Sequence, residues 1–162
     1  MLPNWIERPE VTANLFNPAF CTEILRECAS AYHGEAEHPL PFALAALILP
    51  LILNNKIRER LPTRKGTPVH SWISENEEVK IGLAQKVEKF VPFTREAIMF
   101  GIAHNSLQID ETGGIEVRPR SKKLTTDDDE VKSCLKKAVA LGKNLARSGT
   151  PTTIYSVLGI RP

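Results

Sequence analysis

Apolar residues recur at helical spacing through the first two thirds of the chain. Asn17 and Pro18 predict a helix start, because asparagine caps unpaired N–H groups and proline at the first helical position removes no donor that the helix needs. Apolar positions follow at helical spacing from Phe20 to Tyr32, and Gly34 predicts the helix end. The pattern indicates an amphipathic helix with one face toward a core.

The most apolar run of the chain is LPFALAALILPLIL, residues 40–53. It is apolar on all sides, which predicts a helix surrounded by other elements. It is about four residues short of a membrane span. Pro50 should kink or restart this helix, because proline lacks a backbone donor and clashes with the preceding turn. We therefore expect a central core helix and no membrane contact.

Proline marks the next helices, and a change of period marks a hairpin. Thr67 and Pro68 predict a short helix, and Pro92 should separate the two helices that follow. Apolar and polar residues then alternate on both sides of the turn at 111–114, which predicts a β-hairpin. Two or three helices followed by a hairpin is the order of elements in a winged helix. The alternative is a different helical arrangement with a β-hairpin. In the winged helix the helices would be 68–73, 76–91 and 93–105, and the wing 107–118.

A polar linker, residues 119–129, precedes a long helix that should end near Ser148 and Gly149. Residues 150–158 predict a short docked helix. The apolar sector of the long helix is predicted to hold Val131, Leu135, Ala138, Val139, Gly142 and Ala146. We therefore predict a mainly α fold with a small β-hairpin (α+β). It would be a single domain over 1–162, with a helical core, the hairpin at about 107–118 and a C-terminal helical appendage at about 127–162.

Composition adds little beyond an ordinary globular protein. The net charge of +2 is too small to imply nucleic-acid binding, which would need local clusters. The three cysteines lack metal-finger spacing, and we interpret them as buried, reduced thiols. The first ten residues lack the apolar stretch of a signal peptide, so we expect a cytoplasmic protein.

No spacing typical of catalytic or cofactor-binding residues is present. The chain has no GxxxxGK[ST] or GxGxxG loop, no GxSxG and no HExxH. His33, Glu35, Glu37 and His38 come closest to a metal-binding set, but they fall in a polar turn, where flexible side chains make a poor preformed site. We therefore expect no catalytic residue, no cofactor and no metal, and interpret the chain as non-enzymatic.

Basic residues cluster after the hairpin and along the long helix. Such clusters either contact nucleic-acid phosphates without reading bases or lie in solvent, as basic faces of helices commonly do. The predicted helix 93–105 is too apolar to read base edges, so it should be buried in the core or against a protein partner. The candidate nucleic-acid contacts are Arg118, Arg120, Lys122, Lys123, Lys132, Lys136, Lys143 and Arg147.

Four stretches resemble the middle component of three-component ABC systems. They are NPAFC (17–21), LPFALAALILPL (40–51), VPFTREAIMFGI (91–102) and IYSVLGIRP (154–162), and their order and spacing extend the resemblance over nearly the whole chain. The resemblance implies a small partner of an SMC-like ABC ATPase and of a separate effector, a nuclease or other toxic domain. It also implies bacterial defence against phages or plasmids, the Lamassu type among such systems. It supplies no catalytic residues.

The function we expect is a non-enzymatic adaptor that docks on the ATPase and helps hold or gate the effector. The alternative is a nucleic-acid-binding module that uses the basic clusters, with DNA reached through the assembled complex. The apolar tail should dock either on the chain's own core or on the ATPase, because so much apolar surface is not left in water. The residues expected at a partner interface are Phe93, Met99, Ile154, Tyr155 and Leu158.

Overall fold

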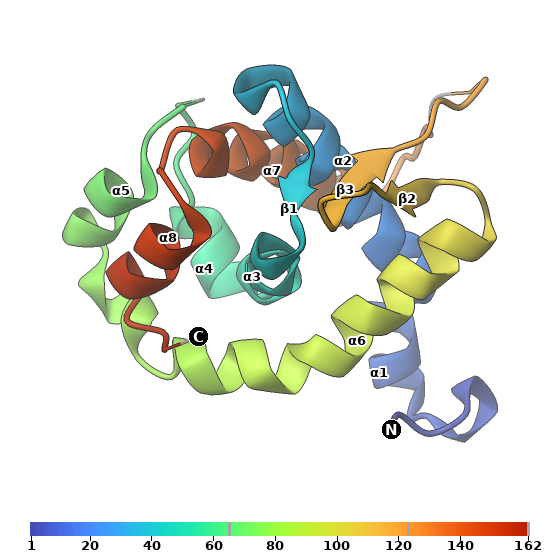
Figure 1. Cartoon of the computed structure of the whole chain (residues 1–162). Helices are drawn as coiled ribbons and strands as arrows, with labels where there is room; N and C mark the ends of the chain where they lie inside the picture. The colour runs from blue at the N-terminus through green and yellow to red at the C-terminus, as the bar shows by residue number, and fades with distance from the viewer. Residues whose placement is uncertain (65, 123, 162) are drawn as a thin grey trace.

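The computed structural model describes residues 1–64, 66–122 and 124–161, and within them it is mainly helical with one small antiparallel sheet (Figure 1). This confirms the predicted α+β class. The elements are the 3-10 turn η1 (Trp5–Glu7), α1 (Glu10–Leu15), α2 (Pro18–Ala36), β1 (Leu40–Pro41), α3 (Phe42–Leu53), α4 (Asn55–Arg60), α5 (Val69–Glu75), the 3-10 turn η2 (Glu77–Lys80), α6 (Leu83–Ala103), β2 (Leu107–Ile109), β3 (Gly114–Val117), α7 (Asp129–Ala146) and α8 (Pro151–Val157).

Helix α2 begins where the sequence predicts. The Asn17 side chain accepts hydrogen bonds from the backbone N–H groups of Ala19 and Phe20, at 2.9 and 3.3 Å. The helix continues through Gly34, which was predicted to end it, because the backbone turns left-handed only at Glu37 (φ 61°). Local chemistry therefore predicted the start of α2 correctly, whereas the predicted end at Gly34 was too early.

Helix α3 lies in the middle of the molecule, between α2 and α7 on one side and α6 on the other (Figure 1). Pro50 is buried inside it, and the helix continues to Leu53. Asn54 then caps α4 by accepting a hydrogen bond from the N–H of Ile57, at 3.1 Å. Among the described residues no helix has both the length and the apolar character that a membrane crossing requires.

Helix α6 corrects the prediction that Pro92 separates two helices. Residues predicted as 76–91 and 93–105 form one helix from residue 83 to 103, preceded by the 3-10 turn η2. Pro92 is exposed, and α6 bends near its middle around α3 (Figure 1). A proline on the outer side of a bent helix costs one backbone hydrogen bond, while the apolar stripe continues past it. The winged-helix arrangement, which needs two separate helices here, is therefore not formed.

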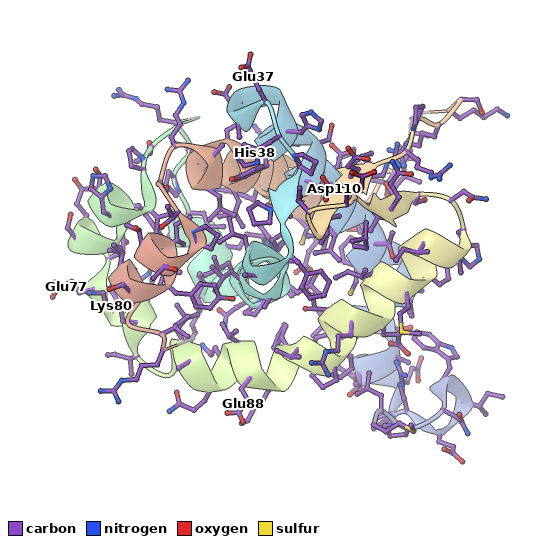
Figure 2. The ribbon with its side chains drawn as sticks, in the orientation of Figure 1. Glu37, His38, Glu77, Lys80, Glu88 and Asp110 are labelled. Carbon is purple, nitrogen blue, oxygen red and sulfur yellow. The ribbon has the colours of Figure 1, made fainter. Side chains whose placement is uncertain are left out.

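The predicted hairpin is present, and its turn is closed by Asp110 (Figure 2). The Asp110 carboxylate accepts hydrogen bonds from the Thr112 hydroxyl (2.7 Å) and from the backbone N–H groups of Thr112 (2.9 Å) and Gly114 (2.7 Å). The hydrogen bond from the Thr112 side chain and those from the backbone lower the pKa of Asp110. Strand β1, absent from the predicted elements, pairs with β3 on the side opposite β2. With two residues it is too short to show an alternating pattern.

Helices α7 and α8 complete the core. Helix α7 packs along α2 in the same direction, since Gly142 lies against Cys28 and Arg147 pairs with Glu35 near the ends of both helices. Its buried face is centred on Cys134, Ala138, Leu141 and Leu145, and is thus rotated from the predicted sector because α7 contacts both α2 and α3. Helix α8 and the residues after it bury Ile154, Tyr155, Leu158 and Ile160 in the same apolar cluster as α2 and α3.

Candidate functional site

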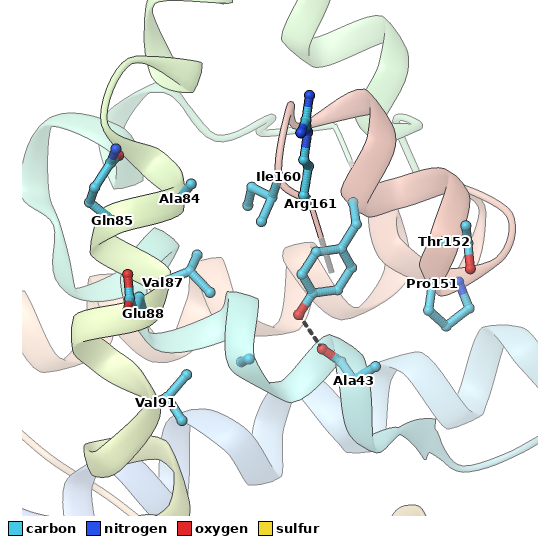
Figure 3. A pocket seen from close by; sticks show the side chains of 12 residues that line it. Ala43, Ala84, Gln85, Val87, Glu88, Val91, Pro151, Thr152, Ile160 and Arg161 are labelled. Carbon is cyan, nitrogen blue, oxygen red and sulfur yellow. Dashed lines mark hydrogen bonds between the residues drawn. The ribbon is translucent and has the colours of Figure 1, made fainter.

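An apolar groove of about 510 Å³ lies between α3, α6 and α8 (Figure 3). Its α6 wall holds Ala84, Val87 and Val91, and the opposite wall holds Pro151 and Ile160 (Figure 3). A second pocket of about 220 Å³ adjoins the groove, since both are lined by Ala43, Ala46, Val91 and Tyr155. Together they form one apolar depression at the junction of three elements, which is a common place for binding sites.

Small side chains and one tyrosine shape the groove. Ala43 and Ala46 of α3 face Ala84 of α6 across it, and their short side chains leave space that longer ones would fill. The Tyr155 hydroxyl donates a hydrogen bond to the Ala43 carbonyl at 2.5 Å, which joins α8 to α3 (Figure 3). Burial raises the pKa of Tyr155, so this phenol keeps its proton and stays a donor at neutral pH.

One buried hydroxyl at the adjoining pocket has no partner. Thr94 is 4% exposed, and its hydroxyl makes no hydrogen bond within the described part of the chain. An unpaired buried hydroxyl costs roughly 1–3 kcal/mol in the folded chain. Phe42 lines the same pocket and is 50% exposed, although its ring is apolar. The depression therefore offers apolar surface, and the Thr94 hydroxyl lies buried beneath it.

Charged side chains surround this depression. Glu88 and Arg161 line the groove, and Arg95 lines the adjoining pocket. An apolar floor with charges at its edge suits an amphipathic segment, whose apolar face enters the groove while its polar face stays in water.

The comparisons with known proteins address the chain as a whole. The model of the family described as ABC-three component (ABC-3C) system Middle Component 3 matches residues 5–162. The chain belongs to this family. Neither the curated proteins nor the solved structures include a match to it. The matched residues of this middle component include every residue that lines the groove.

The residues expected at a partner interface fall into two groups. Ile154, Tyr155 and Leu158 are buried in the middle component's own core, and Tyr155 alone of the three also lines the groove. Of the two alternatives for the tail, the structure shows docking on the chain itself. Apolar side chains bury themselves wherever a matching surface is available, and α3 and α5 supply one.

Phe93 and Met99 lie elsewhere on α6. The Phe93 ring stacks on Phe16, with 3.9 Å between ring centroids, and is half-buried. Arg8 and Glu96 fasten the same N-terminal segment to α6 through two hydrogen bonds of 2.8 and 2.5 Å. Met99 is 71% exposed, so it remains an accessible apolar side chain.

Some of the predicted nucleic-acid contact residues form ion pairs with acidic side chains of the same chain. Arg120 pairs with Glu23 at 2.6 Å and lies 3.6 Å from Glu27. Arg147 pairs with Glu35 at 3.0 Å, and Lys132 lies 3.8 Å from Asp129. These pairs reduce the positive potential that a phosphate backbone would meet.

The other predicted contacts have no ion pair among the described residues, and Lys123 lies outside those residues. Arg118, Lys122 and Lys136 are exposed, and Lys143 is half-buried. Arg118 lines a polar pocket between α2 and β3, which is separate from the α7 residues. These basic residues thus lie in two separate places, Arg118 at the pocket between α2 and β3, and Lys136 and Lys143 on α7.

The histidines and glutamates of the polar turn are not gathered into a ligand set. In the part of the chain that the structure describes, no three metal-binding side chains come together. Glu35 pairs with Arg147, His38 packs edge-on to Tyr32, and Glu37 and His38 lie at the turn that follows α2 (Figure 2).

The cysteines of this middle component are all buried. Burial raises the pKa of the Cys21 thiol to about 12, and it also raises the pKa values of Cys28 and Cys134. A thiolate, and not a thiol, is the nucleophile and metal ligand, so these side chains stay protonated and unreactive at neutral pH.

Sequence reasoning missed both the groove and Arg26. In the sequence the groove residues look like ordinary apolar core positions. A groove cannot be predicted from them, because it depends on which side chains face each other after folding. Arg26 is 7% exposed, and its signal was an arginine beside the apolar residues Leu25 and Ala29 of the predicted helix.

Proposed function

We propose that this middle component is a non-enzymatic adaptor in a bacterial defence system against phages or plasmids. It docks on the ABC ATPase of its system, an SMC-like ATPase, and helps hold or gate a separate effector that carries a nuclease or other toxic domain. It acts in the cytoplasm, in a system of the Lamassu type, and DNA is reached through the assembled complex.

The open apolar groove between α3, α6 and α8 is the observation that carries this proposal. Membership of a middle-component family places the chain beside other components, and they require a surface to bind. The occupant we assign to the groove is an amphipathic helix of the ATPase. Such a helix places apolar side chains at positions i, i+3/i+4 and i+7 into a groove walled by helices. The exposed ring of Phe42 is the group that this helix would cover.

The chemistry of the described side chains supports binding rather than catalysis. The cysteines are protonated at neutral pH, and the two groove pockets are lined by no histidine or cysteine. Nucleophilic catalysis needs an activated nucleophile with a base within hydrogen-bond reach.

Substituting Ala84→Arg tests the docking site. Ala84 is half-buried at the groove wall, and an arginine there would extend a charged side chain across the apolar floor. We expect Ala84→Arg to weaken co-purification of the tagged chain with the ATPase by at least about tenfold, because the long side chain would fill the space that the partner's apolar groups need, and overpacking costs about 1–3 kcal/mol.

The matched control is Ala19→Arg, an identical change at an exposed position in the first turn of α2 that lines neither pocket. It should assemble as the wild type does. Both variants should show the wild-type circular dichroism and thermal midpoint. An Ala84→Arg protein that folds and still binds the ATPase with wild-type affinity would refute the assignment of the groove.

A further inference from the structure

A polar pocket of about 450 Å³ lies between the outer side of α2 and the end of β3. It is distinct from the apolar groove and shares no lining residue with it. Its lining contains two arginines, one histidine and one serine, and no acidic residue. The lining residues are Arg26, Ser30, His33, Gly34, Val117, Arg118 and Pro119.

Arg26 is a buried charge with incomplete pairing. Its guanidinium donates to the carbonyls of Ser106 (2.8 Å) and Arg118 (2.6 Å), which ties α2 to both ends of the hairpin. A guanidinium has five N–H donors, so these bonds leave others available. Among the described residues no carboxylate lies within ion-pair distance of Arg26. Buried charges are ordinarily paired, whereas Arg26 is held by carbonyl acceptors alone.

The nearest acidic residues are engaged elsewhere. Glu23 and Glu27 lie on α2, on either side of Arg26 in the chain, but both face Arg120, at 2.6 and 3.6 Å. Arg120 carries one positive charge against their two, so both carboxylates also act on Arg26 at longer range. Neither of them lines the pocket, where Arg26 lies beside the exposed side chain of Arg118.

Further polar groups line the same pocket. Ser30 and His33 are exposed on α2, one turn and two turns after Arg26, and each can donate a hydrogen bond to an anion. Gly34 lines the pocket too, and a Cβ built on it meets no atom within 4 Å, so the wall is open at this point.

We propose that this pocket binds a phosphate group. Arg26 and Arg118 supply the positive charge, Ser30 and His33 supply further donors, and no acidic residue lines the pocket to oppose an anion. Arginine suits this ligand because its planar fork pairs with two phosphate oxygens at once. The phosphate belongs either to a nucleic-acid backbone or to a free phosphate. This site goes beyond the adaptor role and does not depend on the groove.

The test measures two probes on the purified full chain. Inorganic phosphate is titrated by isothermal calorimetry, and a fluorescently labelled single-stranded oligonucleotide is titrated by anisotropy. The variant is Arg118→Gln, and the control is Lys89→Gln, which removes one exposed positive charge from α6 instead. Arg26 is left unchanged because its hydrogen bonds hold the hairpin. We expect Arg118→Gln to weaken phosphate binding about tenfold, and Lys89→Gln to leave it within about twofold.

A third variant, Ser30→Ala, separates a built site from general attraction, because it removes a donor without changing the charge. Loss of inorganic phosphate binding in Arg118→Gln and Ser30→Ala would assign the site to a free phosphate. Loss of oligonucleotide binding alone would assign it to a phosphodiester backbone. The proposal is overturned if neither probe binds, if Lys89→Gln weakens binding as much as Arg118→Gln, or if Ser30→Ala changes neither affinity. Arg118→Gln should still co-purify with the ATPase, so this test is independent of the docking test.

Discussion

Single small side chains decide how closely the helices approach. A Cβ built on Gly142 would lie 2.2 Å from the carbonyl oxygen of Cys28 and 3.0 Å from the Tyr32 nitrogen. Both are backbone atoms, which cannot rotate away. The absence of a side chain at this position therefore allows α7 to pack directly on α2.

Gly142→Ala should destabilise the protein by about 1–3 kcal/mol, because the added methyl group forces the two helices apart. Urea unfolding followed by circular dichroism measures this as a lower midpoint. The control is Gly34→Ala in α2, where a Cβ meets nothing within 4 Å. That variant should be stabilised by up to about 1 kcal/mol, because alanine favours a helix over glycine. A Gly142→Ala midpoint equal to that of the wild type would contradict the close packing.

The buried thiols should be inert until the chain unfolds. Burial raises the pKa of Cys21 from 9.0 to about 12, so the thiolate is scarce in the folded protein at pH 8. We expect the native protein to react with a thiol reagent far more slowly than the urea-unfolded chain, in which all three cysteines react. Fast stoichiometric labelling of native protein at pH 8 would refute this expectation.

The same shift predicts a loss of stability in alkali. The folded state raises the pKa of Cys21, so it binds this proton more tightly than the unfolded chain does. The stabilising contribution is complete below about pH 9 and declines as pH rises toward about 12. In urea unfolding at increasing pH, Cys21→Ala should lose less stability above pH 9 than the wild type, although it starts lower because of the cavity. Parallel curves would show that the Cys21 thiol is not the group responsible.

The C-terminal helix contributes to the core as an element. Thr150 caps α8 by accepting a hydrogen bond from the Thr153 N–H at 3.2 Å. The apolar side of α8 then faces α3 and α5, and Ile154 is 1% exposed. A terminal segment that frays would expose this surface, so docking of α8 and folding of the chain are coupled.

Ile154→Ala should cost about 2–5 kcal/mol of unfolding free energy, because it removes buried methyl groups and leaves a cavity. Ser156→Ala on the exposed side of the same helix is the control and should change stability by less than about 0.5 kcal/mol. Deletion of residues 152–162 should have a larger effect than Ile154→Ala and cause aggregation of the isolated subunit. If the truncated chain melts at the wild-type temperature, the tail does not stabilise the core.

The predicted phosphate contacts are spread over the molecule and do not all lie on one face. The α7 residues Lys132, Lys136, Lys143 and Arg147 are exposed or half-buried, and Arg147 pairs with Glu35. An exposed pair of this kind contributes about 0–1 kcal/mol to stability. These side chains can therefore be replaced without unfolding the chain.

Replacing all four by glutamine should leave the thermal midpoint of the isolated protein nearly unchanged. In the assembled complex we expect a flatter dependence of duplex-DNA binding on salt, by up to about 0.9 log unit of affinity per log unit of salt for each lost phosphate contact. The measurement is anisotropy at several salt concentrations with and without the ATPase. A slope equal to that of the wild-type complex would mean that this face of α7 lies only in solvent.

Local signals in the sequence were sufficient to predict several elements. Asn17 capping α2, the hairpin turn and the start of α8 after Thr150 all depend on interactions between residues close together in the chain. The run at 40–53, which is apolar on all sides, likewise predicted a buried helix, and this helix is α3. Such features follow from short-range chemistry, and the family resemblance rested on the same stretches.

Only the tertiary structure decided the features that depend on distant residues. Helix α6 continues through Pro92 because packing against α3 outweighs one lost hydrogen bond, and β1 forms because β3 lies beside it. Arg26 is buried because Ser106, just before β2, and Arg118, just after β3, supply carbonyl acceptors. The groove and the polar pocket each combine segments far apart in the chain, and the sequence does not encode in any local pattern which side chains will face each other across a hollow.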